Sequence, residues 1–129
     1  MARNEEDEAY RCAAALRRAL RRFESRCEEI ARANGLTSRQ YLLLLFIRGS
    51  QGGTATVSGL VHDLRLGQST VTELVQRAQE QGLIVREPSR TDGRVVHLSL
   101  SPEGERRLAG AFAELGEERS HLIELVSSL

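Results

Sequence analysis

Apolar residues recur every three or four positions along most of the chain, which is the spacing of helices that pack on one side. From residue 9 to residue 33 this spacing is unbroken, and it predicts one long helix. The repeating apolar positions are Ala13, Leu16, Leu20, Phe23, Cys27 and Ile30. Because their intervals alternate between three and four residues, the seam is typical of a helix that packs against another long helix. Asn34-Gly35 ends this helix.

The next helix is predicted to lie at the centre of a domain. Thr37 and Gln40 have the spacing of a capping box, which marks the start of a helix. The residues that follow are apolar on nearly every side of the helix: Tyr41, Leu42, Leu45 and Phe46. Beyond a glycine-rich loop at residues 49–53, Thr54-Ala55 is expected to add a short strand, and Thr56 is expected to cap a short helix.

Between residues 68 and 100 the apolar spacing changes from that of a helix to that of strands. Residues 68–81 form a helix that Gly82 ends, and its apolar stripe is Val71, Leu74, Val75 and Ala78. Residues 83–85 are predicted to form a buried strand, and residues 95–100 alternate as a second strand does. Asp92-Gly93, between them, is a dipeptide typical of tight hairpin turns. The fold is therefore predicted to be mainly α with a small β-hairpin (α+β).

The end of the chain is predicted to be helical. Ser101 and Pro102 have the N-cap and first-turn preferences of a helix start. The apolar stripe that follows consists of Leu108, Ala111, Phe112, Leu115, Leu122, Ile123, Val126 and Leu129. Gly116 interrupts it, so a bend or a break is expected there. Since the chain offers no third layer to cover the two terminal seams, both terminal helices are expected to pack against a second copy.

Two polar features of residues 68–94 are compatible with contact to DNA. Hydroxyl and amide groups on the polar side of the helix can bond to base edges or phosphates, and the candidate residues there are Gln68, Ser69, Thr70, Thr72, Gln76 and Arg77. Arg90 and Arg94 lie at the hairpin tip, where arginine can enter a narrow minor groove. Asp92 can pair with an arginine there and orient it. Taken alone, the polar side of the helix is more often a solvated surface, and the hairpin is equally compatible with solvated charges.

The order of these segments resembles the MarR family of winged helix-turn-helix transcriptional regulators. The resemblance rests on LTSRQYLLLLF, STVTELV, QGLIVREPS and TDGRVVHLSLSPEG. These segments lie between residues 36 and 104, so the resemblance covers most of the chain. It implies a winged helix-turn-helix DNA-binding domain at residues 36–101, with dimerisation helices at residues 1–35 and 102–129. It also implies a homodimer whose wing carries the pair Asp92 and Arg94, and a small-molecule effector that is often a phenolic acid.

Three residues depart from the pattern of the family. Arg65 stands in the turn before helix 68–81, where a glycine is usual, and it is strained if that position needs a positive φ. Gly67 replaces the usual Ser or Asp cap and caps the helix more weakly. Glu73 stands where arginine is frequent, and its carboxylate repels phosphate. These departures favour a lower DNA affinity or an unusual target site.

Composition limits the class of protein without naming its partner. The chain has 129 residues, of which 40% are hydrophobic and 28% charged, as in a single globular domain. Its 18 basic residues, all arginine, balance 18 acidic ones, so a case for DNA binding rests on local placement. No apolar run is long enough to span a membrane and no signal-peptide pattern is present, so a cytoplasmic location is expected.

Neither catalysis nor a metal or cofactor is expected, because His62, His97 and His121 belong to no metal or nucleophile motif. Cys12 and Cys27 lie too far apart on one helix to form a disulfide, and Cys27 is interpreted as a core residue.

Cys12 lies beside Arg11, and a cationic neighbour can activate a thiol, so it is a candidate redox residue, with an inert thiol as the alternative. Tyr41 is a candidate residue of the effector crevice.

The sequence thus predicts a sequence-specific DNA-binding transcriptional regulator, a ligand- or redox-responsive repressor that binds double-stranded DNA at a near-palindromic operator as a homodimer. The alternative is a winged-helix module that binds proteins and has lost contact with DNA. Zero net charge and Glu73 favour the alternative, and the pair Asp92 and Arg94 argues against it.

Overall fold

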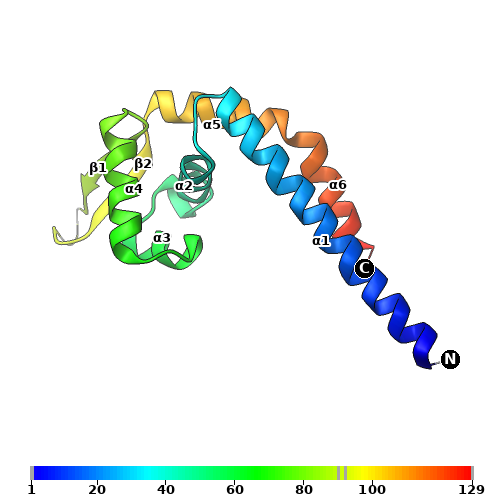
Figure 1. Cartoon of the computed structure of the whole chain (residues 1–129). Helices are drawn as coiled ribbons and strands as arrows, with labels where there is room; N and C mark the ends of the chain where they lie inside the picture. Colours follow the sequence, from blue (N-terminus) through cyan, green and yellow to red (C-terminus); the bar gives the residue numbers. More distant parts are fainter. Residues whose placement is uncertain (1, 90, 92, 129) are drawn as a thin grey trace.

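The computed structural model describes residues 2–89, 91 and 93–128. Its elements, in chain order, are α1 (Ala2–Ala33), α2 (Ser38–Arg48), a short 3-10 turn (Gln51–Gly53), α3 (Val57–Leu64), α4 (Gln68–Glu80), β1 (Ile84–Pro88), β2 (Val96–Leu100), α5 (Pro102–Glu114) and α6 (Gly116–Ser127). Figure 1 shows two parts: a head, made of α2, α3, α4 and the hairpin, and an arm, in which α6 lies along α1. Helix α5 joins the head to the arm (Figure 1). The predicted fold class, mainly α with a small β-hairpin, is confirmed.

The core of the head is built around α2. The capping box at its start is present: the Thr37 side chain accepts from Gln40 N at 3.1 Å, and Gln40 Oε1 accepts from Thr37 N at 3.0 Å. Leu43, Leu44 and Ile47 are fully buried. One prediction needs correcting, because α2 is not covered on every side: the side chain of Leu42 is 41% exposed.

Helix α1 begins seven residues earlier than predicted, at Ala2 instead of residue 9. The first residues of the helix are polar and add nothing to the apolar seam, so the periodicity could not reveal them. Ion pairs between neighbouring turns support this end, as in the contact of 2.9 Å between Arg11 and Glu8. Of the residues on α1, only Ile30 and Ala31 are buried, so most of the seam is partly open within one chain.

The hairpin differs from the prediction in its extent. Strand β1 begins after Leu83 and runs on to Pro88, and it pairs antiparallel with β2. The pairing continues to Pro88 and Val96, and beyond it Ser89 N donates to Val95 O at 2.7 Å. Asp92 lies outside the described residues, so the turn at Asp92-Gly93 stays a prediction.

Two other local predictions are confirmed. Ala55 forms an antiparallel bridge with Leu98, which extends the hairpin by a short third segment. Ser101 caps α5 by accepting from Gly104 N at 3.0 Å, and the helix breaks between Glu114 and Gly116, so α5 and α6 are separate helices.

Helix α6 lies along α1, and the guanidinium of Arg26 contacts the carboxylate of Glu118 at 3.0 Å. Within residues 2–89, 91 and 93–128, no helix combines the length and the apolar character that crossing a membrane requires.

Candidate nucleic-acid interface

The turn between α3 and α4 determines where the polar helix begins. Arg65 adopts the left-handed conformation, with φ 55° and ψ 41°, and its N–H donates to Val61 O at 3.0 Å. Gly67 is the N-cap of α4 and supplies no side-chain bond to the helix. Both expectations for this turn, a strained Arg65 and a weak cap at Gly67, are confirmed.

Helix α4 is amphipathic in the way the sequence predicts. Val71, Val75 and Ala78 are fully buried against the head. Most of the candidate DNA-contact residues lie on the opposite, exposed side: Gln68, Ser69, Thr72, Gln76 and Arg77. Thr70 is half-buried and lines a shallow hollow between α4 and the start of α2, together with Arg39. The exposed side is thus a continuous row of hydrogen-bonding groups, with Thr70 at its edge.

The charges on this side of α4 largely neutralise one another. Glu73 and Arg77, one turn apart, form an ion pair at 2.9 Å. Gln76 donates to Glu80 at 3.4 Å. Because Arg77 and Gln76 each have an acidic partner, the helix offers polar contacts to a ligand without a strong positive field.

The hairpin lies beside α4, with its tip at the same end of the head as the first turn of α4 (Figure 1). Arg94 is exposed. Ser89 and Thr91 form a turn at the base of the tip, in which Thr91 N donates to Ser89 Oγ at 3.3 Å. Arg90 and Asp92 lie outside the described residues, so their roles at the tip stay predictions, as does the orientation of Arg94 by Asp92.

Two arginines that the sequence reasoning passed over also flank α4. Arg86 lines a hollow with Thr72 and Gln76, and Arg39 lines the hollow on the other side of the helix with Arg77. Arg86 follows the buried Ile84 by two residues, so both lie on the same side of β1. Alternation along β1 could have indicated Arg86 from the sequence, but only if the strand had been expected to continue past Val85. No local pattern pointed to Arg39.

The candidate effector and redox residues do not come together within one chain. Cys12 is exposed on the outer half of α1, about 22 Å along the helix axis from Cys27. Tyr41 is buried in the head, where burial, followed by the neighbouring Cys27, raises the pKa of its hydroxyl. Burial also raises the pKa of the Cys27 thiol, and Cys27 packs against the core as interpreted.

Among the described residues, no three of the His, Cys, Asp and Glu side chains are grouped closely enough to hold a metal ion.

Comparison with known proteins relates this arrangement to one family. A model of the MarR family matches residues 34–95, which include α2, α3, α4, β1 and the hairpin tip. Over these residues the chain is similar to the MarR family. In the terms of the winged helix-turn-helix fold, α3 and α4 are the helix-turn-helix and the hairpin is the wing.

Individual relatives extend the comparison. The organic hydroperoxide resistance transcriptional regulator of Bacillus subtilis is 38% identical over 69 residues, which are 54% of this chain and 46% of that protein. The match therefore spans about half the length of that relative.

Solved structures of MarR proteins have the same fold along nearly the whole chain. A MarR family transcription regulator is 25% identical, with a TM-score of 0.78, and the match covers 94% of this chain and 79% of that one. A cysteine-to-serine mutant of MarR from E. coli, solved in complex with operator DNA, is 19% identical with a TM-score of 0.69. That match covers 90% of this chain and 82% of the other.

Proposed function

We propose that this protein is a sequence-specific, DNA-binding transcriptional regulator of the MarR type that represses its target genes as a homodimer in the cytoplasm. One observation carries the proposal: the exposed polar side of α4 lies next to the hairpin (Figure 1). The first turn of α4 and the end of β1 lie on the same side of the head (Figure 1). Support comes from the relatives, of which one is named a transcriptional regulator and another was solved with operator DNA. The proposal includes no catalytic activity.

The polar side of α4 enters the major groove in this proposal. Gln68, Ser69 and Thr72 contact base edges or phosphates near the first turn, and Gln76 does so one turn later. Arg94 reaches the adjacent minor groove, where the negative potential is strongest when the groove is narrow. Arg39 and Arg86 contact the phosphates on either side, which positions the helix without reading sequence.

The homodimer forms through the arms. Exposed apolar side chains on α6, such as Ile123 and Val126, are 59% and 53% exposed within one chain. A second copy related by a two-fold axis would cover them and present two heads to half-sites roughly 34 Å apart.

A selection experiment tests DNA binding directly. The purified protein is incubated with a pool of random-sequence duplexes at low salt, and the enriched duplex is used in gel shifts. Arg94→Ala should weaken binding to that duplex by about 1–3 kcal/mol. Arg32→Ala, which removes an exposed arginine from the arm, is the matched control and should leave binding unchanged. If no duplex is enriched at micromolar protein, the protein-binding module becomes the better interpretation.

We further propose a response to organic hydroperoxides through Cys12, because its thiol is exposed and the Bacillus subtilis relative is named for hydroperoxide resistance. The thiolate would attack the O–O bond, which gives a cysteine sulfenic acid and releases the alcohol. Cumene hydroperoxide should then lower DNA binding in the wild type but not in Cys12→Ser. Loss of binding in both proteins would exclude Cys12. A phenolic effector near Tyr41 is the alternative signal, and salicylate in the same gel shift tests it.

A further inference from the structure

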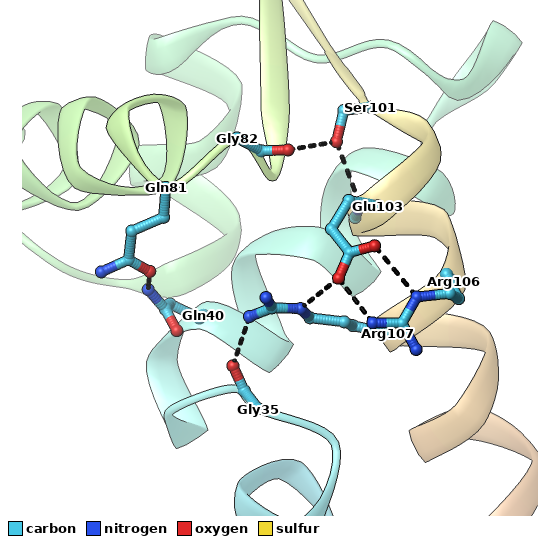
Figure 2. A network of polar contacts seen from close by, with 9 residues as sticks. Gly35, Gln40, Gln81, Gly82, Ser101, Glu103, Arg106 and Arg107 are labelled. Atoms are coloured by element: carbon cyan, nitrogen blue, oxygen red, sulfur yellow. Dashed lines mark hydrogen bonds and ion pairs between the residues drawn. The ribbon is translucent and has the colours of Figure 1, made fainter.

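A buried amide joins two helices of the head. The side chain of Gln40 is only 6% exposed. Its oxygen accepts from Thr37 N within the capping box of α2. Its Nε2 donates to Gln81 Oε1 at 2.7 Å (Figure 2). Gln81 is the C-cap residue of α4, where the polar helix ends. The amide of Gln40 therefore couples the start of α2 to the end of α4.

The same end of α4 is also held by α5. Ser101 Oγ donates to Gly82 O (Figure 2). Ser101 N donates to Leu83 O at 3.0 Å. A Cβ at Gly104 would lie 2.0 Å from Leu83 O, so the backbones of α5 and of the exit from α4 are in direct contact. The exit from α4 is thus fixed between α2 and α5.

The opposite end of α4 has weaker local support. Gly67 provides no side-chain cap, and the turn before it contains the left-handed Arg65. The first turn nevertheless carries the exposed Gln68 and Ser69, which are proposed to read DNA. A helix of 13 residues is about 20 Å long, so a tilt of about 5° at its C-terminal end moves the first turn by roughly 1.7 Å. That shift exceeds the tolerance of a hydrogen bond.

We propose that Gln40 and Gln81 are positioning residues for DNA recognition: their amide pair sets the angle at which α4 presents its first turn to the bases. The inference rests on the proposed function. Neither residue contacts DNA in it, and both act through Gln68 and Ser69. Losing the pair affects contacts to bases more than contacts to phosphates, because base contacts require stricter geometry.

The test compares two substitutions of the exposed residue Gln81. Gln81→Met keeps the length of the side chain but removes the acceptor for Gln40. Gln81→Glu keeps an acceptor in the same place. The measured quantity is the ratio of the dissociation constants for a scrambled duplex and for the duplex that the wild type enriches, at one salt concentration. A change in overall charge alters both dissociation constants by nearly the same factor, so its effect cancels in the ratio.

The Met variant should lose roughly tenfold of this preference, the size of one lost base contact, while the Glu variant stays within about twofold of the wild type. Gln51→Met, at an exposed site in the 3-10 turn, controls for the replacement itself. All ratios are measured well below each variant's melting temperature. A Met variant that melts earlier but keeps its full preference would show a structural role only, and it would overturn the inference. So would a Glu variant that loses as much preference as the Met variant.

A second set of variants tests the pair itself. In Gln40→Glu the carboxylate still accepts from Thr37 N, and the exposed amide of Gln81 can turn to donate to it, so the preference should survive. Gln40→Glu combined with Gln81→Glu brings two acceptors face to face, and the preference should fall by more than the two single effects combined. Additive effects would overturn the inference. Failure of the wild type to enrich any duplex would instead refute the proposed function.

Discussion

At the scale of single residues, Arg65 is the clearest source of strain. Among the described residues it is the only non-glycine residue with a positive φ, at 55°. A Cβ in the left-handed region lies close to the following carbonyl, which costs roughly 1–2 kcal/mol. The conformation persists because it ends α3 and directs the chain into α4. The turn that orients α4 therefore lowers the stability of the head.

Arg65→Gly should raise the free energy of unfolding by about 1 kcal/mol, because glycine adopts this conformation without the clash. Urea unfolding followed by circular dichroism measures the change. Arg65→Ala is the control, since it removes the same side chain but keeps the Cβ. Equal stabilisation by both substitutions would trace the effect to the guanidinium and not to the backbone.

Glu73 is the residue that most directly opposes DNA on α4. Glu73→Arg should tighten binding to a scrambled duplex and steepen its salt dependence by up to roughly two units of slope, because the introduced arginine and the released Arg77 could each contact a phosphate. Fluorescence anisotropy across a series of salt concentrations measures both quantities. Glu28→Arg is the matched control on the arm, where Glu28 pairs with Arg32 one turn away as Glu73 does with Arg77. If the two variants bind alike, the exposed side of α4 does not approach DNA.

At the scale of elements, the features predicted best from the sequence are those that depend on residues close together in the chain. The capping box of Thr37 and Gln40 and the cap at Ser101 are local patterns, and the structure has both. The first strand was expected only as far as Val85, whereas β1 continues to Pro88 because it pairs with β2 along its whole length. The polar side of α4 could be predicted from periodicity. The pairing of Gln40 with Gln81 could not, because 41 residues separate them and no local pattern links them.

Helix α5 begins with an ion pair that makes stability depend on pH. Glu103 accepts from Arg106 and Arg107, and these bonds lower the pKa of its carboxyl from 4.5 to about 2. A carboxyl whose pKa is lowered by folding stabilises the fold at every pH above the pKa that it has in the unfolded chain. The contribution of Glu103 is therefore complete at neutral pH. It is lost as the pH falls from about 4.5 towards 2.

Glu103→Gln should therefore flatten the loss of stability over that acidic range and lower stability at neutral pH. Urea unfolding at pH values between 7 and 3 gives the profile. Arg106→Met should flatten it in part, because two of the three bonds to this carboxylate come from Arg106. Profiles unchanged in both variants would show that the ion pair does not form in solution.

At the scale of the whole molecule, the arm is the part whose apolar side chains are least buried within a single chain. Its outer half projects beyond the head (Figure 1). Apolar side chains of α6, such as Ile123 and Val126, are exposed. An exposed apolar surface of this kind is typical of an interface between copies.

Ile123→Asp should convert the protein towards a monomer, because the proposed interface would bury an unpaired carboxylate. Sedimentation equilibrium measures the mass, and the same variant should lose affinity for a two-site duplex. Ser120→Asp adds the same charge on an exposed part of α6 and serves as the control. A wild type that sediments as a monomer at high concentration would contradict the proposed dimer.

The contact at Gly104 has a consequence for how such a molecule can change through mutation. Any side chain at this position must push α5 away from the exit of α4, since the space is already taken by Leu83 O. Helix α5 leads into the arm, so the displacement would move the arm relative to the head, and it would also remove part of the support for the exit of α4. Substitution at this codon is thus a route by which a gene duplicate could change the spacing of the two heads in the proposed dimer and the angle of α4 in a single step.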